Sequence, residues 1–139
     1  MKLVVDNNVL FSIMNPKSAA SYLFSSLRAE FFTTEYVKSE LTEHREECLL
    51  KSKLSEHEFE IRQAEVEGLI KFFKYPEYEY FLMEAIKSLP EDPKDSSYVA
   101  LALSINAAIW SNDTHLKQQS LVKAYSTKEL VEEMLRGMI

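Results

Sequence analysis

Short apolar runs alternate with longer runs of amphipathic spacing along the whole chain. The short runs hold β-branched, aromatic or aliphatic residues and are bounded by polar or turn-forming residues, a pattern typical of strands. Four strands are predicted: Leu3–Val5, Phe31–Thr33, Ala108–Trp110 and Val122–Tyr125. The segment Ile70–Tyr75 fits either a further strand or the continuation of a helix, because its periodicity is compatible with both.

Helical spacing fills the intervals between the strands. Six helices are predicted: Ser18–Leu27, Glu35–Lys51, Glu56–Leu69, Glu77–Ser88, Pro93–Ile105 and Thr127–Leu135. This alternation is typical of a parallel sheet covered by helices on both faces. With 139 residues, two glycines, four prolines and no internal repeat, the chain is expected to form a single domain over residues 1–139.

Composition excludes several classes of protein. No apolar run approaches the roughly 18 residues that a membrane span requires. Only three apolar residues separate Lys2 from Asp6, which is too few for a secretory signal. We therefore expect a cytoplasmic protein without membrane contact. The single cysteine, Cys48, allows neither an internal disulfide nor a cysteine-rich zinc site and is expected to pack as a small apolar residue.

The formal net charge of -6 argues against a broad, non-specific grip on nucleic acid, which depends on clustered Lys and Arg. It does not exclude nuclease chemistry. Acids that converge on divalent cations are neutralised locally, and the cation supplies the positive field that a phosphate needs.

Two aspartates directly follow predicted strands or their short polar extensions. Asp6 ends the run "KLVVD" and Asp113 ends "AIWSND". Ligands of open parallel sheets bind beyond the carboxyl ends of the strands, so both carboxylates are expected at one site. Each also has a purely structural explanation, because Asp6 could start a turn and Asp113 could cap the next helix.

Two further acids belong to predicted helices. Glu40 lies beside an apolar stripe that includes His44, so its carboxylate should be partly covered and should pair with a cation or with His44 itself. Asp95 opens a helix that is apolar nearly all round, which indicates a packed pocket, although the helix dipole alone could favour an acid there. Asp92 is interpreted as a structural N-cap before Pro93.

These four acids have a common chemistry. Magnesium and manganese prefer carboxylate oxygens and keep several waters for exchange with substrate. One such ion lowers the pKa of a bound water, and a second stabilises the leaving oxygen of a phosphodiester. Four converging acids could hold one or two Mg²⁺ or Mn²⁺ ions.

Three blocks of the sequence resemble the PIN domain family of metal-dependent ribonucleases, which includes the VapC toxins. "VVDNNVLFS" is similar to the opening block of the family, with Asn7 in place of the usual Thr or Ser. "DPKDSSYVALALSINAAIWSND" is similar to the closing block, and "TTEYVKSELTEH" matches the middle block more weakly. The stretch 46–91 matches only in length and helicity.

The resemblance implies a PIN-like three-layer α/β/α sandwich with a central, mainly parallel sheet of short strands. It implies an endoribonuclease that uses Mg²⁺ or Mn²⁺ and cleaves RNA, often as a homodimer and often with a small antitoxin. The implied acidic quartet is Asp6, Glu40, Asp95 and Asp113, with Asn8 and Ser111 as supporting polar groups. His115 stands where many members carry another acid, so a fifth carboxylate is not expected at that position.

Three other functions are alternatives to a metal-dependent ribonuclease. A non-catalytic PIN-like module for protein interaction or RNA docking would explain the missing fifth acid and the negative charge. A phosphatase of the haloacid dehalogenase type would need a second aspartate at position 8, where Asn8 stands. A nucleotide-binding fold would need a glycine-rich loop, which Gly68 and Gly137 cannot form.

The segment "YPEYEYFLMEAI" carries more aromatic surface than one helix face readily buries. It is expected either to belong to the core or to form a contact with a second copy or an antitoxin. Tyr78 and Phe81 are the residues on which that choice depends.

Overall fold

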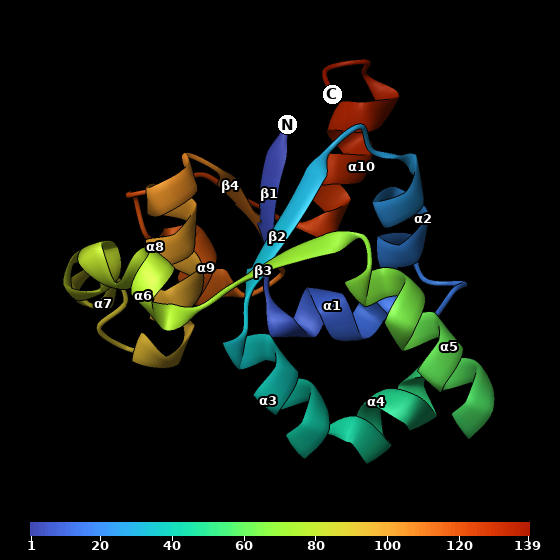
Figure 1. Cartoon of the computed structure of the whole chain (residues 1–139). Coiled ribbons are helices and arrows are strands. Elements are labelled where there is room, and N and C mark those ends of the chain that lie inside the picture. The colour runs from blue at the N-terminus through green and yellow to red at the C-terminus, as the bar shows by residue number, and fades with distance from the viewer.

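Five short strands, all parallel, form the centre of the molecule (Figure 1). The computed structural model describes residues 1–139. The strands lie in the order β3-β2-β1-β4-β5. Their bounds are β1 Lys2–Val5, β2 Glu30–Thr34, β3 Ile70–Phe73, β4 Ala108–Trp110 and β5 Ala124–Tyr125. The chain moves outward from β1 to β3 and then returns to place β4 on the other side of β1, so the strand order reverses between β1 and β4.

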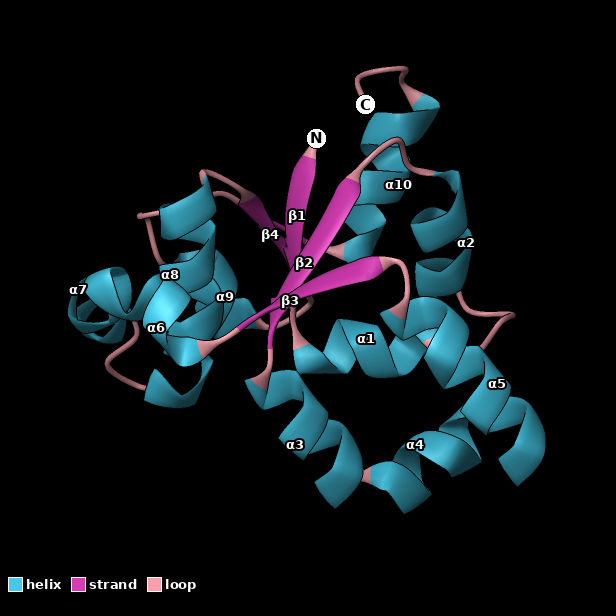
Figure 2. Cartoon of the chain, viewed as in Figure 1, coloured by secondary structure: helices cyan, strands magenta, loops and turns pink.

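Helices cover both faces of this sheet (Figure 2). On one side, α8 (Ser96–Ile105) packs against β1, β2 and β4 and is itself covered by α6 (Tyr75–Tyr78) and α7 (Leu82–Ser88). On the other side lie α1 (Asn7–Ile13), α2 (Ala19–Ser26) and α10 (Thr127–Leu135), while α9 (Thr114–Gln118) contacts β5. The predicted sandwich of helices around a parallel sheet is confirmed.

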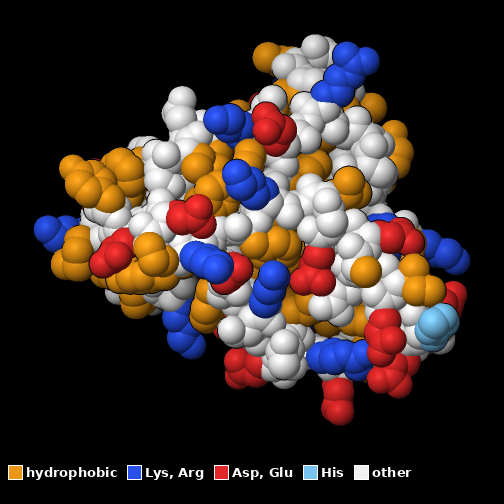
Figure 3. All heavy atoms as spheres, in the orientation of Figure 1, with side chains coloured by type: hydrophobic (Ala, Val, Ile, Leu, Met, Phe, Trp, Pro, Cys, Tyr) orange, Lys and Arg blue, Asp and Glu red, His pale blue; other side chains and the backbone are white.

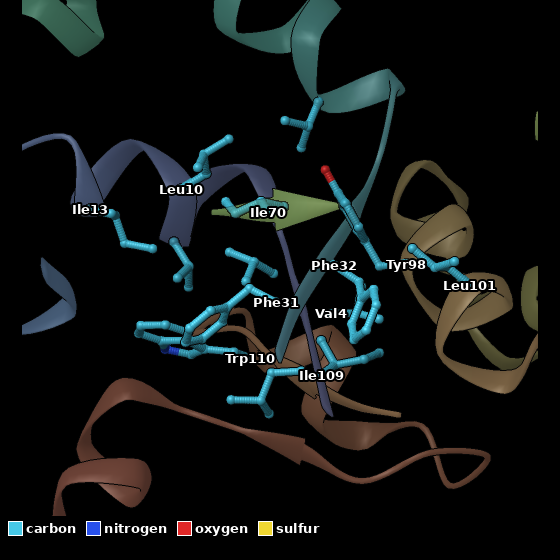
Figure 4. Packing of buried hydrophobic residues seen from close by; sticks show 14 of the residues in the cluster. Val4, Leu10, Ile13, Phe31, Phe32, Ile70, Tyr98, Leu101, Ile109 and Trp110 are labelled. Carbon is cyan, nitrogen blue, oxygen red and sulfur yellow. The ribbon is translucent and has the colours of Figure 1, made fainter. Parts of the chain in front are cut away.

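The core lies between the sheet and these helices (Figure 4). Val4 and Val5 of β1 are fully buried, as expected for a central strand covered on both faces. Phe31 of β2 packs on Trp110 of β4, with ring centroids 6.0 Å apart. The run from Tyr98 to Ala102 in α8 is also fully buried, which confirms the predicted interior helix. Cys48 is buried as predicted.

The expected single helix over Glu35–Lys51 is wrong. The chain forms α3 (Tyr36–Glu43) and α4 (Arg45–Ser52), separated by His44 with φ −106° and ψ 23°. The break lets α4 turn and pack on α1, a tertiary contact that local spacing does not encode. His44 therefore leaves the apolar stripe, and its side chain is 43% exposed instead of buried.

Several other helices and strands begin or end at residues that differ from the predicted ones. The segment Ile70–Tyr75, which fitted either a strand or a helix, contains strand β3. The predicted helix Glu77–Ser88 is interrupted by a 3₁₀ turn at Glu79–Phe81 between α6 and α7. Helix α5 spans Glu56–Glu67, and Pro93–Asp95 form a 3₁₀ turn before α8. The short helices α1 and α9 were not predicted, because seven and five residues are too few for a clear period. No helix is both long and apolar enough to cross a membrane.

Candidate metal centre

Asp6 lies at the carboxyl end of β1 and is only 1% exposed. Its Oδ1 accepts a hydrogen bond of 2.8 Å from the backbone N–H of Val9 and so caps α1, while its Oδ2 accepts one from the Ser111 hydroxyl. The structural role foreseen for Asp6 is therefore real, but it does not explain the burial of a charge. Burial raises the pKa of Asp6 to about 6, even though both hydrogen bonds act to lower it.

Asp113 comes to the same edge of the sheet from β4. Val5 pairs with Trp110 in the parallel register, so the residues that follow the two strands are neighbours. Ser111 joins them, because its hydroxyl oxygen also accepts a bond of 3.0 Å from the backbone N–H of Asp113. The Asp113 carboxylate in turn caps α9 through the backbone N–H of His115 at 2.7 Å. This edge is the point of strand reversal where open parallel sheets bind ligands.

Asp95 reaches the same place from the N-terminal end of α8. When protonated, its carboxyl hydrogen-bonds to Asp113. Burial, followed by the negative charges of Asp92, Asp6 and Asp113, raises the pKa of Asp95 to about 7. Three aspartates that are distant in the sequence thus share one partly buried site.

Asp92 and His115 lie next to Asp113, although the sequence did not predict them as ligands. Asp92 occupies the position before the 3₁₀ turn, but its side chain accepts no capping bond, so the interpretation as a structural cap is wrong. Its Oδ2 instead lies 3.8 Å from Nδ1 of His115, and that nitrogen lies 3.6 Å from Oδ1 of Asp113. These three side chains could converge on one metal ion. The three-residue spacing between Asp92 and Asp95 was the signal available in the sequence.

Glu40 lies on α3, to one side of the aspartates. Its Oε2 is 3.5 Å from Nε2 of His44, the pairing considered as its alternative role. Its carboxylate also accepts a hydrogen bond from the Tyr36 hydroxyl, which raises the pKa of Tyr36 to about 12. The charge of Asp95 acts on the same hydroxyl. Glu40 is thus linked to the site through Tyr36, and with Glu43 and His44 it forms a second group of potential ligands.

The two supporting polar residues, Ser111 and Asn8, differ in burial and in their contacts with the acids. Ser111 is fully buried and bridges Asp6 and Asp113. Asn8 is exposed, and its side chain lines a polar groove of about 450 Å³ between α1 and α4. The backbone N–H of Asn8 bonds to Asp6, and no side-chain contact of Asn8 with the acids is present.

The residues of this site fit a hard divalent cation. No Lys or Arg forms an ion pair with Asp6, Asp95 or Asp113, and His115 beside Asp113 is the one basic side chain paired with these acids. Burial and mutual repulsion raise the pKa values of Asp6 and Asp95, so their ionised forms are unfavourable in the metal-free protein. A bound cation would offset this unfavourable free energy. Carboxylate oxygens are the ligands that magnesium and manganese prefer.

Comparison with known proteins agrees with this architecture. The sequence profile described as "PIN domain" matches residues 4–135. The chain belongs to the PIN domain family. The match covers nearly the whole chain and confirms the resemblance seen in the three sequence blocks.

Among solved structures, this PIN domain is similar to a chain of VapBC2 from Rickettsia felis bound to a DNA fragment from their promoter. The TM-score is 0.66 over 91% of this chain and 98% of the other, at 11% identity. The similarity at that identity is one of fold. No curated protein sequence matches the chain.

Proposed function

We propose that this PIN domain is an endoribonuclease that hydrolyses RNA phosphodiester bonds with Mg²⁺ or Mn²⁺. The observation that carries the proposal is that Asp6, Asp95 and Asp113 act on one another electrostatically at the strand-reversal edge of the sheet, with no Lys or Arg paired to any of them. Membership of the PIN domain family supports the same chemistry. The substrate class rests on the family alone.

In this proposal Asp6, Asp95 and Asp113 hold the cation and Glu40 completes the site from α3. A divalent cation in such a site lowers the pKa of a bound water and polarises the phosphate. Asp6 is oriented by Val9 and Ser111, which leave lone pairs of both carboxylate oxygens free. The pKa of Asp95 is raised to about 7, chiefly by burial, so a cation held there would compete with a proton for this carboxylate.

Cleavage of labelled single-stranded RNA tests this proposal. Asp6→Asn and Asp95→Asn remove a charged ligand while keeping side-chain shape, so each is expected to lower the Mn²⁺-dependent cleavage rate by a hundredfold or more, a loss of about 3 kcal/mol or more in transition-state stabilisation. Glu30→Gln is the matched control, because Glu30 is an exposed acid at the start of β2, at the opposite edge of the sheet.

Wild-type activity that disappears with a chelator and persists in Glu30→Gln supports the proposal. Unchanged cleavage in Asp6→Asn or Asp95→Asn would contradict it. Folded wild-type protein without any cleavage would favour the non-catalytic alternative, in which the domain serves as a docking module for RNA or protein.

We further propose that the protein is a toxin that acts in the cytoplasm as a homodimer and is held by a small antitoxin. The fold shared with a chain of the VapBC2 complex supports this proposal. Exposed apolar side chains over α6 and α7, including Tyr80 and Met83, provide a surface for a protein partner (Figure 3). Light scattering that gives a monomer mass at working concentrations would contradict the homodimer.

A further inference from the structure

An aromatic groove of about 230 Å³ lies beside the acidic site. Its apolar walls come from Tyr36 at the start of α3, Tyr75 and Tyr78 of α6, and Leu82 and Ile86 of α7. We call this the tyrosine groove. Tyr36 and Tyr75 are 40% and 51% exposed, so their rings are accessible from solvent. Pockets for drug-sized ligands have volumes of about 300 Å³ or more, so this groove suits a single ring system.

The accessible rings are held in place. Tyr78 is buried and contacts Tyr75 edge-on, with ring centroids 5.9 Å apart and planes at 71°. Burial of Tyr78 also shows that this residue belongs to the core, one of the two roles that the sequence left open. The Tyr36 hydroxyl interacts with the Glu40 carboxylate, which raises the pKa of Tyr36 to about 12. The groove therefore presents two accessible aromatic rings, one of which packs edge-on against a buried tyrosine.

Polar groups at the groove lack partners in the protein. The hydroxyls of Ser96 and Ser97, both lining the groove, are buried and make no hydrogen bond. Ser96 is only 1% exposed. Buried hydroxyls are paired in the great majority of native structures, so two unpaired ones in one groove indicate a ligand with hydrogen-bonding edges. Lys94 also lines the groove and supplies a positive charge there.

The groove and the acidic site are contiguous. Ser96 directly follows Asp95 in the chain, and Tyr36 joins the groove to Glu40. A ligand in the groove would therefore lie next to a phosphodiester held at the aspartates. A flat ring with polar edges, linked to an anionic backbone, is the chemistry of an unpaired nucleotide.

We propose that the tyrosine groove binds one unpaired base of the RNA substrate, next to the phosphate that is cut. The base stacks on Tyr75 and Tyr36, its edge bonds to the hydroxyls of Ser96 and Ser97, and Lys94 contacts the adjoining phosphate. This inference rests on the proposed ribonuclease function and adds a determinant of where the RNA is cleaved.

The experiment measures RNA binding separately from cleavage. A labelled single-stranded RNA hexamer, and a set in which each base in turn is removed to leave an abasic ribose, are titrated by fluorescence anisotropy with chelator present so that no turnover occurs. Removal of one base is expected to weaken binding by about tenfold in the wild type, the effect of losing one stacked base.

Two variants and one control assign that effect to the groove. Tyr75→Ala is expected to weaken binding of the intact hexamer by about tenfold and to abolish the penalty at the sensitive position. Tyr22→Ala is the matched control, since Tyr22 on α2 is 60% exposed and lies outside the groove. Ser96→Ala is expected to weaken binding without lowering the melting temperature, because its hydroxyl has no protein partner.

Equal penalties at every abasic position, or equal binding by Tyr75→Ala and Tyr22→Ala, would overturn the inference even if the RNA is cleaved. Base-dependent binding without metal-dependent cleavage would support the groove and contradict the nuclease. A change in molecular mass in Tyr75→Ala with unchanged RNA binding would show that the groove contacts a second copy of the chain, and would also overturn the inference.

Discussion

Individual carboxyl groups carry the strongest evidence in this molecule. Asp6 satisfies a helix N-terminus and accepts a hydroxyl, yet its burial still raises its pKa to about 6. Asp95 has a pKa raised to about 7, first by burial and then by the negative charges of three other acids. A structural role alone would select a neutral residue at such positions, since an unpaired buried charge costs stability. The acids are explained best by a cation that offsets this cost.

The raised pKa values predict how stability depends on pH. In the unfolded chain these carboxyls titrate near pH 4, whereas Asp6 and Asp95 titrate near pH 6 and 7 in the folded protein. The folded state therefore binds more protons between these limits, and its stability falls as pH rises from about 4 to 7. Metal-free protein is expected to melt roughly 5 °C or more lower at pH 8 than at pH 5.

Scanning calorimetry in buffers with chelator measures this shift. Asp6→Asn is expected to flatten the pH dependence, while Glu30→Gln leaves it unchanged because Glu30 is exposed. Added Mn²⁺ should raise the melting temperature more at pH 8 than at pH 5, since protons compete for the same oxygens. A melting temperature that rises between pH 5 and pH 8 in the metal-free protein would contradict this account.

Helix α8 is the element that fixes the geometry of the site. It carries Asp95 at its N-terminal end and Tyr98 three residues later. The hydroxyl of the buried Tyr98 (Figure 4) accepts a hydrogen bond from the backbone N–H of Asn7, at the start of α1, over 3.2 Å. This bond ties α8 to the residue after Asp6 and so holds two of the candidate ligands relative to each other.

Tyr98→Phe tests the importance of this tie. The substitution keeps the packed ring but leaves the Asn7 N–H without its acceptor, which costs about 1 to 2 kcal/mol in the free energy of unfolding. Urea denaturation measures the change. Tyr22→Phe is the control, because Tyr22 is largely exposed, and its stability should equal that of the wild type. Equal stability of both variants would show that the bond does not hold α8 in place.

The strands and helices that the sequence predicted well are those determined by the periodicity of neighbouring residues. The apolar strands β1 and β4 and the all-apolar helix α8 follow from residue periodicity, and three of the four predicted acids come together because each follows a strand or opens such a helix. The break at His44 and the inward position of Asp92 depend on packing between elements. Local spacing contains no signal for the break at His44, and for Asp92 it offered only the three-residue distance to Asp95, so both predictions were wrong.

At the scale of the whole molecule, strand order creates the site. The reversal between β1 and β4 leaves Asp6 and Asp113 side by side, and the crossover through α8 returns Asp95 to the same edge. Glu40 is the exception, because α3 directs it toward Tyr36 and His44. We therefore propose three primary ligands, Asp6, Asp95 and Asp113, with Glu40 approaching from the side.

Anomalous diffraction from a crystal soaked in Mn²⁺ tests this central claim most directly. The account predicts a peak bounded by the carboxylates of Asp6, Asp95 and Asp113, since manganese prefers carboxylate oxygens, and no peak at that position in Asp95→Asn. A fully soaked crystal without a peak among these three side chains, or with manganese only at Glu40, Glu43 and His44, would contradict it.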